Sequence, residues 1–187
     1  MLTIVTGNHK KYQQIAWALP AGVEACQRDL DMPETQTNLI TDISYDKCLQ
    51  AYVEVQWPVL VDDSGIYFDA YNNFPGALTK YLYQWVWLEG IQRLYTDVED
   101  MRARFQCVLS YMDSTLPEPI QFVGEIEGRL DFSHIQQAED VKLPYDLIFV
   151  PDGMDEPVFL DMQSRNDEYN HRVRATRKFV NWYWQKI

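Results

Sequence analysis

The sequence is poor in cysteine and in positive charge, and each shortage excludes a class of protein. Its three cysteines, Cys26, Cys48 and Cys107, lie far apart and form no CxxC pair, which excludes a disulfide scaffold and a zinc finger. The 16 basic residues face 28 acidic ones, and a formal charge of −12 argues against a nucleic-acid polymer as partner. We therefore expect a cytoplasmic protein with reduced cysteines.

Long apolar runs are also missing. No stretch approaches the roughly 20 apolar residues that span a membrane, so we expect no membrane association. The first eight residues contain neither a basic region nor a long apolar segment, and we expect no signal peptide. Hydrophobic residues make up 47% of the 187, which is ample for a core. We expect a single domain over residues 1–187.

Apolar patterns of strand and helix type are interspersed along the chain. The expected strands cover residues 2–5, 23–27, 59–61, 104–111, 120–132 and 147–150. The expected helices cover residues 9–19, 41–55, 78–88 and the end of the chain from about His171. Thr41 or Asp42 is the expected N-cap of the second helix. This order predicts an α/β or α+β fold and leaves the strand order open.

The first candidate motif is Thr6-Gly7-Asn8-His9-Lys10-Lys11, between an expected strand and an expected helix. A helix N-terminus offers backbone N–H groups and positive charge, which suit phosphate oxygens. Gly7 permits close approach of a ligand, and the lysines add charge. The motif is neither a Walker loop nor a GxGxxG fingerprint. Taken alone, it is explained better as an ordinary capped turn.

The second candidate is Val61-Asp62-Asp63-Ser64-Gly65, which we expect to follow the end of a buried strand. Ligands of α/β proteins bind at the carboxyl ends of such strands. Two neighbouring carboxylates repel each other, and a hard cation such as Mg²⁺ relieves that repulsion and bridges to phosphate oxygens. A solvated turn is an equally good reading of the segment taken alone.

Two further segments carry candidate binding residues. His171 and Arg172 open the expected C-terminal helix, where first-turn donors suit a carbonyl or a phosphate. We expect the later cations of that helix, Arg174, Arg177 and Lys178, to lie on the surface. Tyr145-Asp146 pairs an aromatic ring with an acid, which suits a nucleobase. Packing of that tyrosine in the core is the commoner alternative.

Together these motifs resemble the inosine-triphosphate pyrophosphatase family, from Thr3 to about Phe179. The motifs that carry the resemblance are Thr6-Gly7-Asn8-x-x-Lys11, Asp31-x-Pro33-Glu34, Val61-Asp62-Asp63-Ser64-Gly65, Phe74-Pro75-Gly76, Tyr145-Asp146-x-x-Phe149-x-Pro151-Asp152-Gly153 and His171-Arg172. The resemblance implies an α/β fold with an elongated mixed sheet flanked by helices, two lobes with a cleft between them, and a homodimer. It implies hydrolysis of dITP, ITP or XTP to the monophosphate and pyrophosphate, with Mg²⁺ and with water attacking the α-phosphate.

The resemblance also implies roles for individual residues. Glu34 and Asp63 would bind the metal with Asp62 alongside, and Asp63 would be the general base, so that Asp63, Asp62 and Lys11 form the catalytic set. Lys11, Arg165 and Arg172 would give a local positive wall. The residues implied in substrate binding are Thr6, Gly7, Asn8, His9, Lys10, Lys11, Lys47, Ser64, Leu143, Tyr145, Asp146, Arg165, Asn166, His171 and Arg172.

Three departures from the family pattern concern the base pocket. Leu143-Pro144 replaces Phe-Gly, so an aromatic that stacks on the base is missing; such stacking is worth about 1–3 kcal/mol. Asn166 replaces a lysine, with Arg165 one position earlier, and Asn170 replaces a serine. Because the acids are kept, we expect an active pyrophosphatase. The alternatives are the same fold acting on a canonical or modified nucleotide, and a non-catalytic nucleotide-binding protein.

Overall fold

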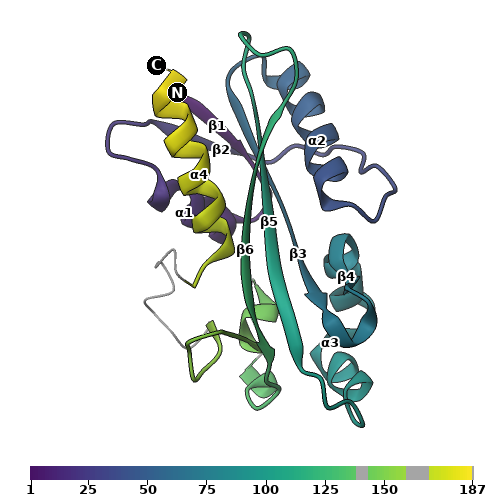
Figure 1. Ribbon diagram of the computed structural model, residues 1–187. Helices are drawn as coiled ribbons and strands as arrows, with labels where there is room; N and C mark the ends of the chain where they lie inside the picture. The colour runs from purple at the N-terminus through teal and green to yellow at the C-terminus, as the bar shows by residue number, and fades with distance from the viewer. Residues whose placement is uncertain (138–142, 159–168, 187) are drawn as a thin grey trace.

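A mixed sheet of seven strands forms the centre of the computed structural model, which describes residues 1–137, 143–158 and 169–186 (Figure 1). The strands are β1 (Leu2–Val5), β2 (Ala25–Arg28), β3 (Val59–Phe68), β4 (Phe74–Pro75), β5 (Arg102–Met112), β6 (Ile120–Leu130) and β7 (Phe149–Pro151). The α-helices in the described ranges are α1 (His9–Ala18), α2 (Ile40–Val55), α3 (Thr79–Leu94) and α4 (His171–Lys186). The prediction of an α/β fold with an elongated mixed sheet and flanking helices is confirmed, whereas the two lobes and their cleft stay a prediction.

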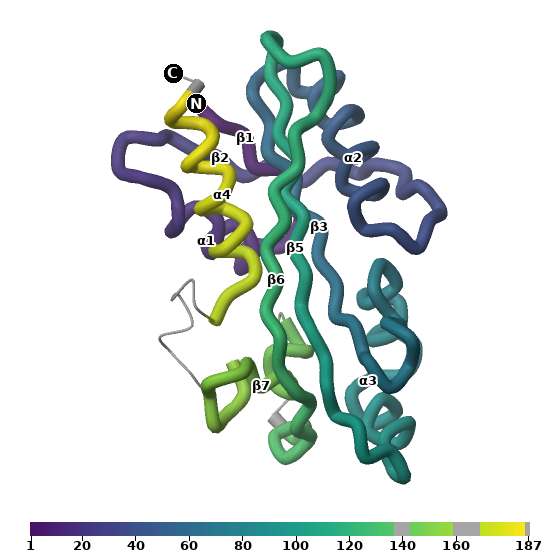
Figure 2. The backbone as a smooth tube through the Cα atoms, in the orientation of Figure 1, coloured from purple at the N-terminus to yellow at the C-terminus, as the bar shows by residue number. Residues whose placement is uncertain are grey.

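The sheet has the order β2-β1-β3-β5-β6-β7, with β4 paired to β3 away from this path. β1 runs parallel to β2 and β3, and the other pairings are antiparallel. β3 pairs with β5 over its whole length, from Val59 opposite Met112 to Phe68 opposite Ala103. The long strands β5 and β6 extend through most of the molecule (Figure 2).

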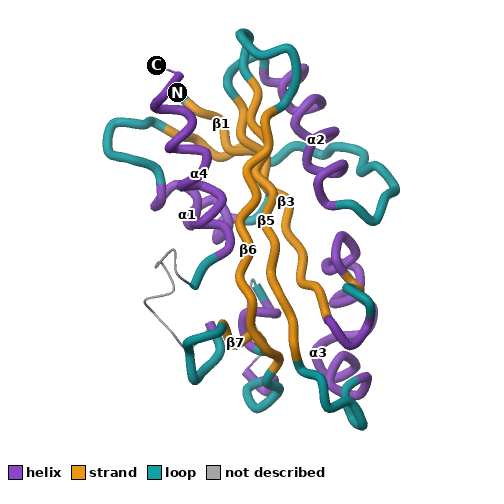
Figure 3. Tube along the Cα trace, in the orientation of Figure 1, coloured by secondary structure: helices purple, strands orange, loops and turns teal. Residues whose placement is uncertain are grey.

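Helices cover both faces of the sheet, with α1 and α4 on one side and α2 and α3 on the other (Figure 3). The alternation of side chains along β3 decides which helix each residue meets. Leu60 packs in one cluster with Ile15 of α1 and Phe179 of α4. Its neighbour Val61 packs in another cluster with Cys48 of α2.

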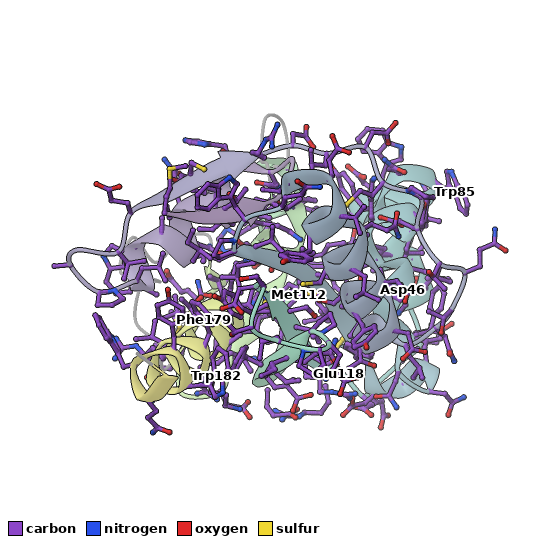
Figure 4. All side chains as sticks on the ribbon, turned by 90° about the horizontal axis from the view of Figure 1, so that it is seen from above. Asp46, Trp85, Met112, Glu118, Phe179 and Trp182 are labelled. Atoms are coloured by element: carbon purple, nitrogen blue, oxygen red, sulfur yellow. The ribbon has the colours of Figure 1, made fainter. Side chains whose placement is uncertain are left out.

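Helix α4 packs closely on β6. A Cβ atom at Gly124 would lie 2.0 Å from the carbonyl oxygen of His171 and 2.5 Å from the amide nitrogen of Ala175, so only glycine allows this approach. Farther along, Phe179 and Trp182 lie on the α4 side (Figure 4) and both pack on the ring of Phe122. The first turn of α4 is thereby fixed against the sheet.

One expectation about the sheet is wrong: the strand at residues 59–61 does not end before Asp62. β3 continues to Phe68, and the Asp62-Asp63-Ser64-Gly65 segment lies inside it. Ser64-Gly65 has the composition of a turn, but glycine is required at position 65 for a different reason. A Cβ atom at Gly65 would lie 2.3 Å from the carbonyl oxygen of Gly76, so close packing against the next segment requires glycine.

Helix bounds also differ from the expectation in places. α2 begins at Ile40, and its N-cap is Leu39 rather than Thr41 or Asp42. α3 is longer than expected, and Trp87 interrupts it with a φ of 58°. Tertiary packing extends these elements beyond what local patterns indicate. In the described ranges, no helix combines the length and apolar character needed to cross a bilayer.

Candidate active site

The candidate site lies beside β3, just past the end of β1. β1 pairs with β3 as far as Val61, and β4 pairs with it from Tyr67. Among the described residues, positions 62–66 have no strand partner on that edge. The turn that follows β1 and the loop that follows β2 both begin at this edge, because parallel strands end on the same side.

Asp62 points toward the face covered by α1 and α4. Its carboxylate is fully buried and meets two cations: Lys11 Nζ lies 2.8 Å from Oδ2, and Arg172 Nε donates to Oδ1 at 2.9 Å. The thiol of Cys107 on β5 donates to Oδ1 at 3.1 Å. Burial alone would raise the pKa of Asp62, but Arg172 and Lys11 hold it far below its ordinary value. Asp62 is therefore a buried anion that joins β3 to both helices.

The guanidinium of Arg172 is shared between several partners. Besides Asp62, it donates from Nη2 to Ser64 Oγ at 2.8 Å and from Nη1 to Gln14 Oε1. The side chain is 2% exposed. The backbone N–H of Arg172 donates to the side chain of Asn170, which caps the start of α4. Of the predicted positive wall, Lys11 and Arg172 therefore share the single negative charge of Asp62.

Asp63 points toward the opposite face, where α2 supplies a cation. Lys47 Nζ lies 2.9 Å from Asp63 Oδ2 and 2.7 Å from Glu34 Oε1. Tyr81 of α3 donates to the other oxygen of Glu34 at 3.4 Å. One ammonium group therefore brings together the two carboxylates that the sequence singled out as metal ligands. Asp62, on the other face, does not join them.

The acids of this second cluster differ in pKa. Burial raises the pKa of Asp63, and Lys47 offsets that increase only in part. Burial also acts to raise the pKa of Glu34, but the attraction of Lys47 outweighs it, so the pKa is lowered. The pKa of Lys47 is raised, because the two carboxylates outweigh its burial. A carboxylate with a raised pKa is the stronger base, which suits Asp63 to accept a proton.

The Glu34–Asp63 pair fits a hard divalent cation. Both carboxylates already hold a single cationic group, and Mg²⁺ typically takes one or two protein carboxylates and completes its shell with water and substrate phosphates. Among the described residues, no group of three His, Cys, Asp or Glu side chains forms a complete cage. The donor set therefore matches a metal that shares its shell with a substrate.

The turn after β1 is organised by Asn8. Its side chain accepts hydrogen bonds from the backbone N–H groups of Lys10 and Lys11, and its own N–H donates to Thr6 Oγ1. A Cβ atom at Gly7 would lie 2.8 Å from a carboxylate oxygen of Asp29, so a larger residue here would require the Asp29 side chain to move. His9 is exposed and meets Gln27 at 2.9 Å. The capped turn that we considered is therefore present, whether or not it also binds phosphate.

The predicted base-binding residues Tyr145, His171 and Asp146 differ in their contacts and in their pKa values. Tyr145 is 5% exposed, packs in the core and donates from its hydroxyl to Thr79 O at 2.9 Å, so the core role is present. His171 stacks on Phe105, and burial lowers its pKa well below the ordinary value. Burial raises the pKa of Asp146 to about 6, although Arg172 and Lys10 oppose the change.

Leu143 precedes the short 3-10 turn Pro144–Leu147 and is partly buried. Arg165 and Asn166 lie outside the described residues. Sequence reasoning missed Cys107 and Gln14 as partners in the Asp62 network. No local motif marks either residue. Cys107 reaches the network through the register of β5, and Gln14 through the packing of α1 against α4.

The sequence matches the Ham1 family model over residues 2–182. A dITP/XTP pyrophosphatase of Methanopyrus kandleri is 32% identical over 187 residues, which cover 97% of this chain and 95% of the relative. A dITP/XTP pyrophosphatase of Thermococcus kodakarensis is 29% identical over 188 residues, covering 100% and 98%.

Solved structures show the same architecture. The Ham1 protein of Staphylococcus aureus superposes with a TM-score of 0.79 at 19% identity and covers 100% of both chains. A HAM1 protein from Coxiella burnetii superposes with a TM-score of 0.77 at 23% identity, covering 99% of this chain and 100% of its own. At these identities the likeness establishes the shared fold.

Replacing Asp62 with Asn is expected to lower the free energy of unfolding by about 3–5 kcal/mol, because Arg172 loses a buried counter-ion. The Asp62 pKa is lowered in the fold, so this contribution is present at neutral pH and is lost as the pH falls below the unfolded value of 3.8. Urea denaturation at neutral pH measures the change. The control is Asp152→Asn, which breaks an exposed 2.7 Å pair with Arg102 and should cost less than about 1 kcal/mol. Equal losses in both variants would contradict the role of Asp62.

Replacing Asp146 with Asn is expected to have the opposite effect. The folded protein holds the Asp146 proton up to about pH 6, whereas the unfolded chain loses it near 3.8. The carboxyl therefore destabilises the fold increasingly between these values, and the cost persists at higher pH. The variant should be more stable than the wild type by up to about 3 kcal/mol near pH 8 and equally stable near pH 4. A gain of the same size at both pH values rules out this titration.

Proposed function

The chain belongs to the Ham1 family, and from this premise we propose that it hydrolyses non-canonical purine nucleoside triphosphates such as dITP, ITP and XTP. The products are the monophosphate and pyrophosphate. Two observations support the proposal: full-length relatives are named dITP/XTP pyrophosphatases, and Glu34 and Asp63 converge on one cationic group. The convergence carries the proposal, because it brings a base and an oxygen ligand together where the family motif predicts them.

In this reaction Asp63 accepts the proton of the attacking water. The water oxygen bonds to the α-phosphorus, and the bond from that phosphorus to the oxygen leading to the β-phosphate breaks. Pyrophosphate leaves with the bonding electron pair. The raised pKa of Asp63 supports its role as the base, and general-base catalysis typically contributes about 10²–10⁴-fold.

Mg²⁺, when bound, polarises the phosphate oxygens and offsets their charge. Glu34 and Asp63 would hold it. Lys47 lies next to both carboxylates and can donate to a phosphate oxygen. Preorganised donors of this kind stabilise the charge that builds up in phosphoryl transfer.

The turn at residues 6–11 would receive the triphosphate. Gly7 lets the backbone approach the ligand, and Lys10 and Lys11 add positive charge at the start of α1. Asp62 and Arg172 act indirectly here. They fix Lys11 and Ser64 in place through the ion pair and the hydrogen bond described above.

Base recognition is assigned to His171, Tyr145 and Asp146, with Leu143 nearby. Burial keeps His171 neutral, so one ring nitrogen donates and the other accepts. A carboxyl at Asp146 with a pKa of about 6 accepts a hydrogen bond from a base N–H at neutral pH. Leu143 supplies an apolar contact in place of a stacked ring.

We also propose a homodimer, as the resemblance implies. Apolar side chains are exposed at the start of and along α3, among them Leu78, Trp85 and Trp87. Trp85 is 78% exposed and lies at the periphery of the molecule (Figure 4). Exposed aromatic residues of this kind are typical of protein interfaces.

A substrate panel tests the function. Purified protein is incubated with MgCl₂ and with dITP, ITP, XTP or a canonical triphosphate, and orthophosphate is measured with and without added inorganic pyrophosphatase. We expect a signal with the non-canonical purines only when pyrophosphatase is present, and its loss on adding EDTA. Orthophosphate without pyrophosphatase, or no turnover of any triphosphate, contradicts the proposal. Faster turnover of a canonical nucleotide would instead identify an altered base specificity.

Replacing Asp63 with Asn is expected to lower kcat by about 10²-fold or more, because the amide cannot accept the proton. Circular dichroism and the melting temperature should show a folded protein. Asp152→Asn again serves as the control, since its carboxylate pairs with Arg102 on the surface. Activity of Asp63→Asn within a few-fold of the wild type excludes Asp63 as the base.

A further inference from the structure

The charges that meet at the site cancel one another. Lys11 and Arg172 pair with Asp62, and Lys47 pairs with Glu34 and Asp63. Three cations therefore face three carboxylates. A metal ion that takes the position between Glu34 and Asp63 must displace Lys47, which then needs another acceptor.

Lys47 holds the position that matters most for a metal. Its ammonium lies within 2.9 Å of one oxygen of Glu34 and one of Asp63. The side chains of Lys47 and Asp63 are partly buried, and that of Glu34 is exposed. Mg²⁺ binds oxygen ligands at about 2.0–2.1 Å. A dication and an ammonium cannot both lie between the same two oxygens, because their like charges repel at short range in a partly buried site. A metal ion that bridges these two oxygens therefore requires the ammonium to move away.

Moving Lys47 alone is costly. Its ammonium contacts both Glu34 and Asp63, so its departure would leave both carboxylates without that partner. A phosphate oxygen provides a replacement acceptor, and the flexible four-carbon stem of lysine allows the ammonium to reach it while the backbone of α2 stays in place. The metal thus compensates the carboxylates that lose Lys47, and the phosphate gives the displaced ammonium a new acceptor. Each ligand therefore favours binding of the other.

We propose that Lys47 keeps free divalent metal out of the Glu34–Asp63 pair. The metal then enters only together with a phosphate group, whose oxygen replaces the two carboxylates as the partner of the Lys47 ammonium. This inference rests on the proposed function, because it assumes a phosphorylated substrate. The two ligands are positively coupled, and coupling of this kind is reciprocal. The protein therefore takes up a metal–nucleotide complex and does not store the metal beforehand.

The test compares two probes on wild-type protein and on Lys47→Met. The first probe is MnCl₂ alone, with free Mn²⁺ followed by its EPR signal. The second is the preformed Mg²⁺ complex of inorganic tripolyphosphate, titrated by calorimetry. We expect Lys47→Met to bind free Mn²⁺ about tenfold or more tightly than the wild type and the tripolyphosphate complex about tenfold more weakly. Changes in opposite directions cannot arise from partial unfolding.

Two further variants serve as controls. Lys80→Met removes a charge that acts on Glu34 without contacting it, and its Mn²⁺ affinity should stay within about threefold of the wild type. Lys47→Arg keeps the cation and should retain the weak affinity for free Mn²⁺. Unchanged or weaker Mn²⁺ binding by folded Lys47→Met overturns the inference, as does an equal gain in Lys80→Met.

Failure of this inference is distinguishable from failure of the proposed function. If the wild type hydrolyses dITP but Lys47→Met gains no affinity for Mn²⁺, only the inference fails. If Lys47→Met gains that affinity but the wild type hydrolyses no triphosphate, only the proposed function fails.

Discussion

The alternation of side chains along β3 is the constraint on which the site depends. Asp62 and Asp63 are neighbours in sequence, and a strand sends them to opposite faces of the sheet. Asp62 meets Lys11 and Arg172 from α1 and α4, whereas Asp63 meets Lys47 from α2. Two adjacent acids thus connect the helices of both faces to one strand. A shift of β3 by one residue would exchange their partners and disrupt both clusters.

The two acids differ in their surroundings, and this difference separates their roles. Asp62 is fully buried between two cations and keeps a strongly lowered pKa, so it stays charged and fixes Lys11 and Arg172. Asp63 shares one cation with Glu34, and burial raises its pKa. Pairs of titratable groups whose environments push their pKa values apart are typical of catalytic sites. The net charge of −12 conceals this arrangement, because the site itself is electrically balanced.

Local sequence patterns predicted most of the elements and the family, but not the relations between them. The motif with Asp62 and Asp63 contributed to the prediction of the family, which is confirmed. The expected end of its strand was wrong, because Gly65 is required by close packing and does not form a turn. Lys47 was expected to bind substrate, and nothing local indicated that it lies between Glu34 and Asp63. Such contacts join segments far apart in the chain, and only the three-dimensional fold specifies them.

The same architecture explains why the base pocket departs from the family pattern while the acids are kept. Asp146 belongs to a 3-10 segment that Leu143 precedes, and this segment packs with α3, as the hydrogen bond from Tyr145 to Thr79 shows. The carboxylates instead belong to β3 and the loop before α2, and the β3 residues just before Asp62 pack in two other core clusters. Changes at Leu143 and Pro144 leave the contact of Asp63 with Lys47 intact, because sites without shared partners act almost independently. Asp146 is an exception, because Arg172 pairs with Asp62 and also opposes the rise in the pKa of Asp146. Base preference and phosphate chemistry can therefore diverge separately on this fold.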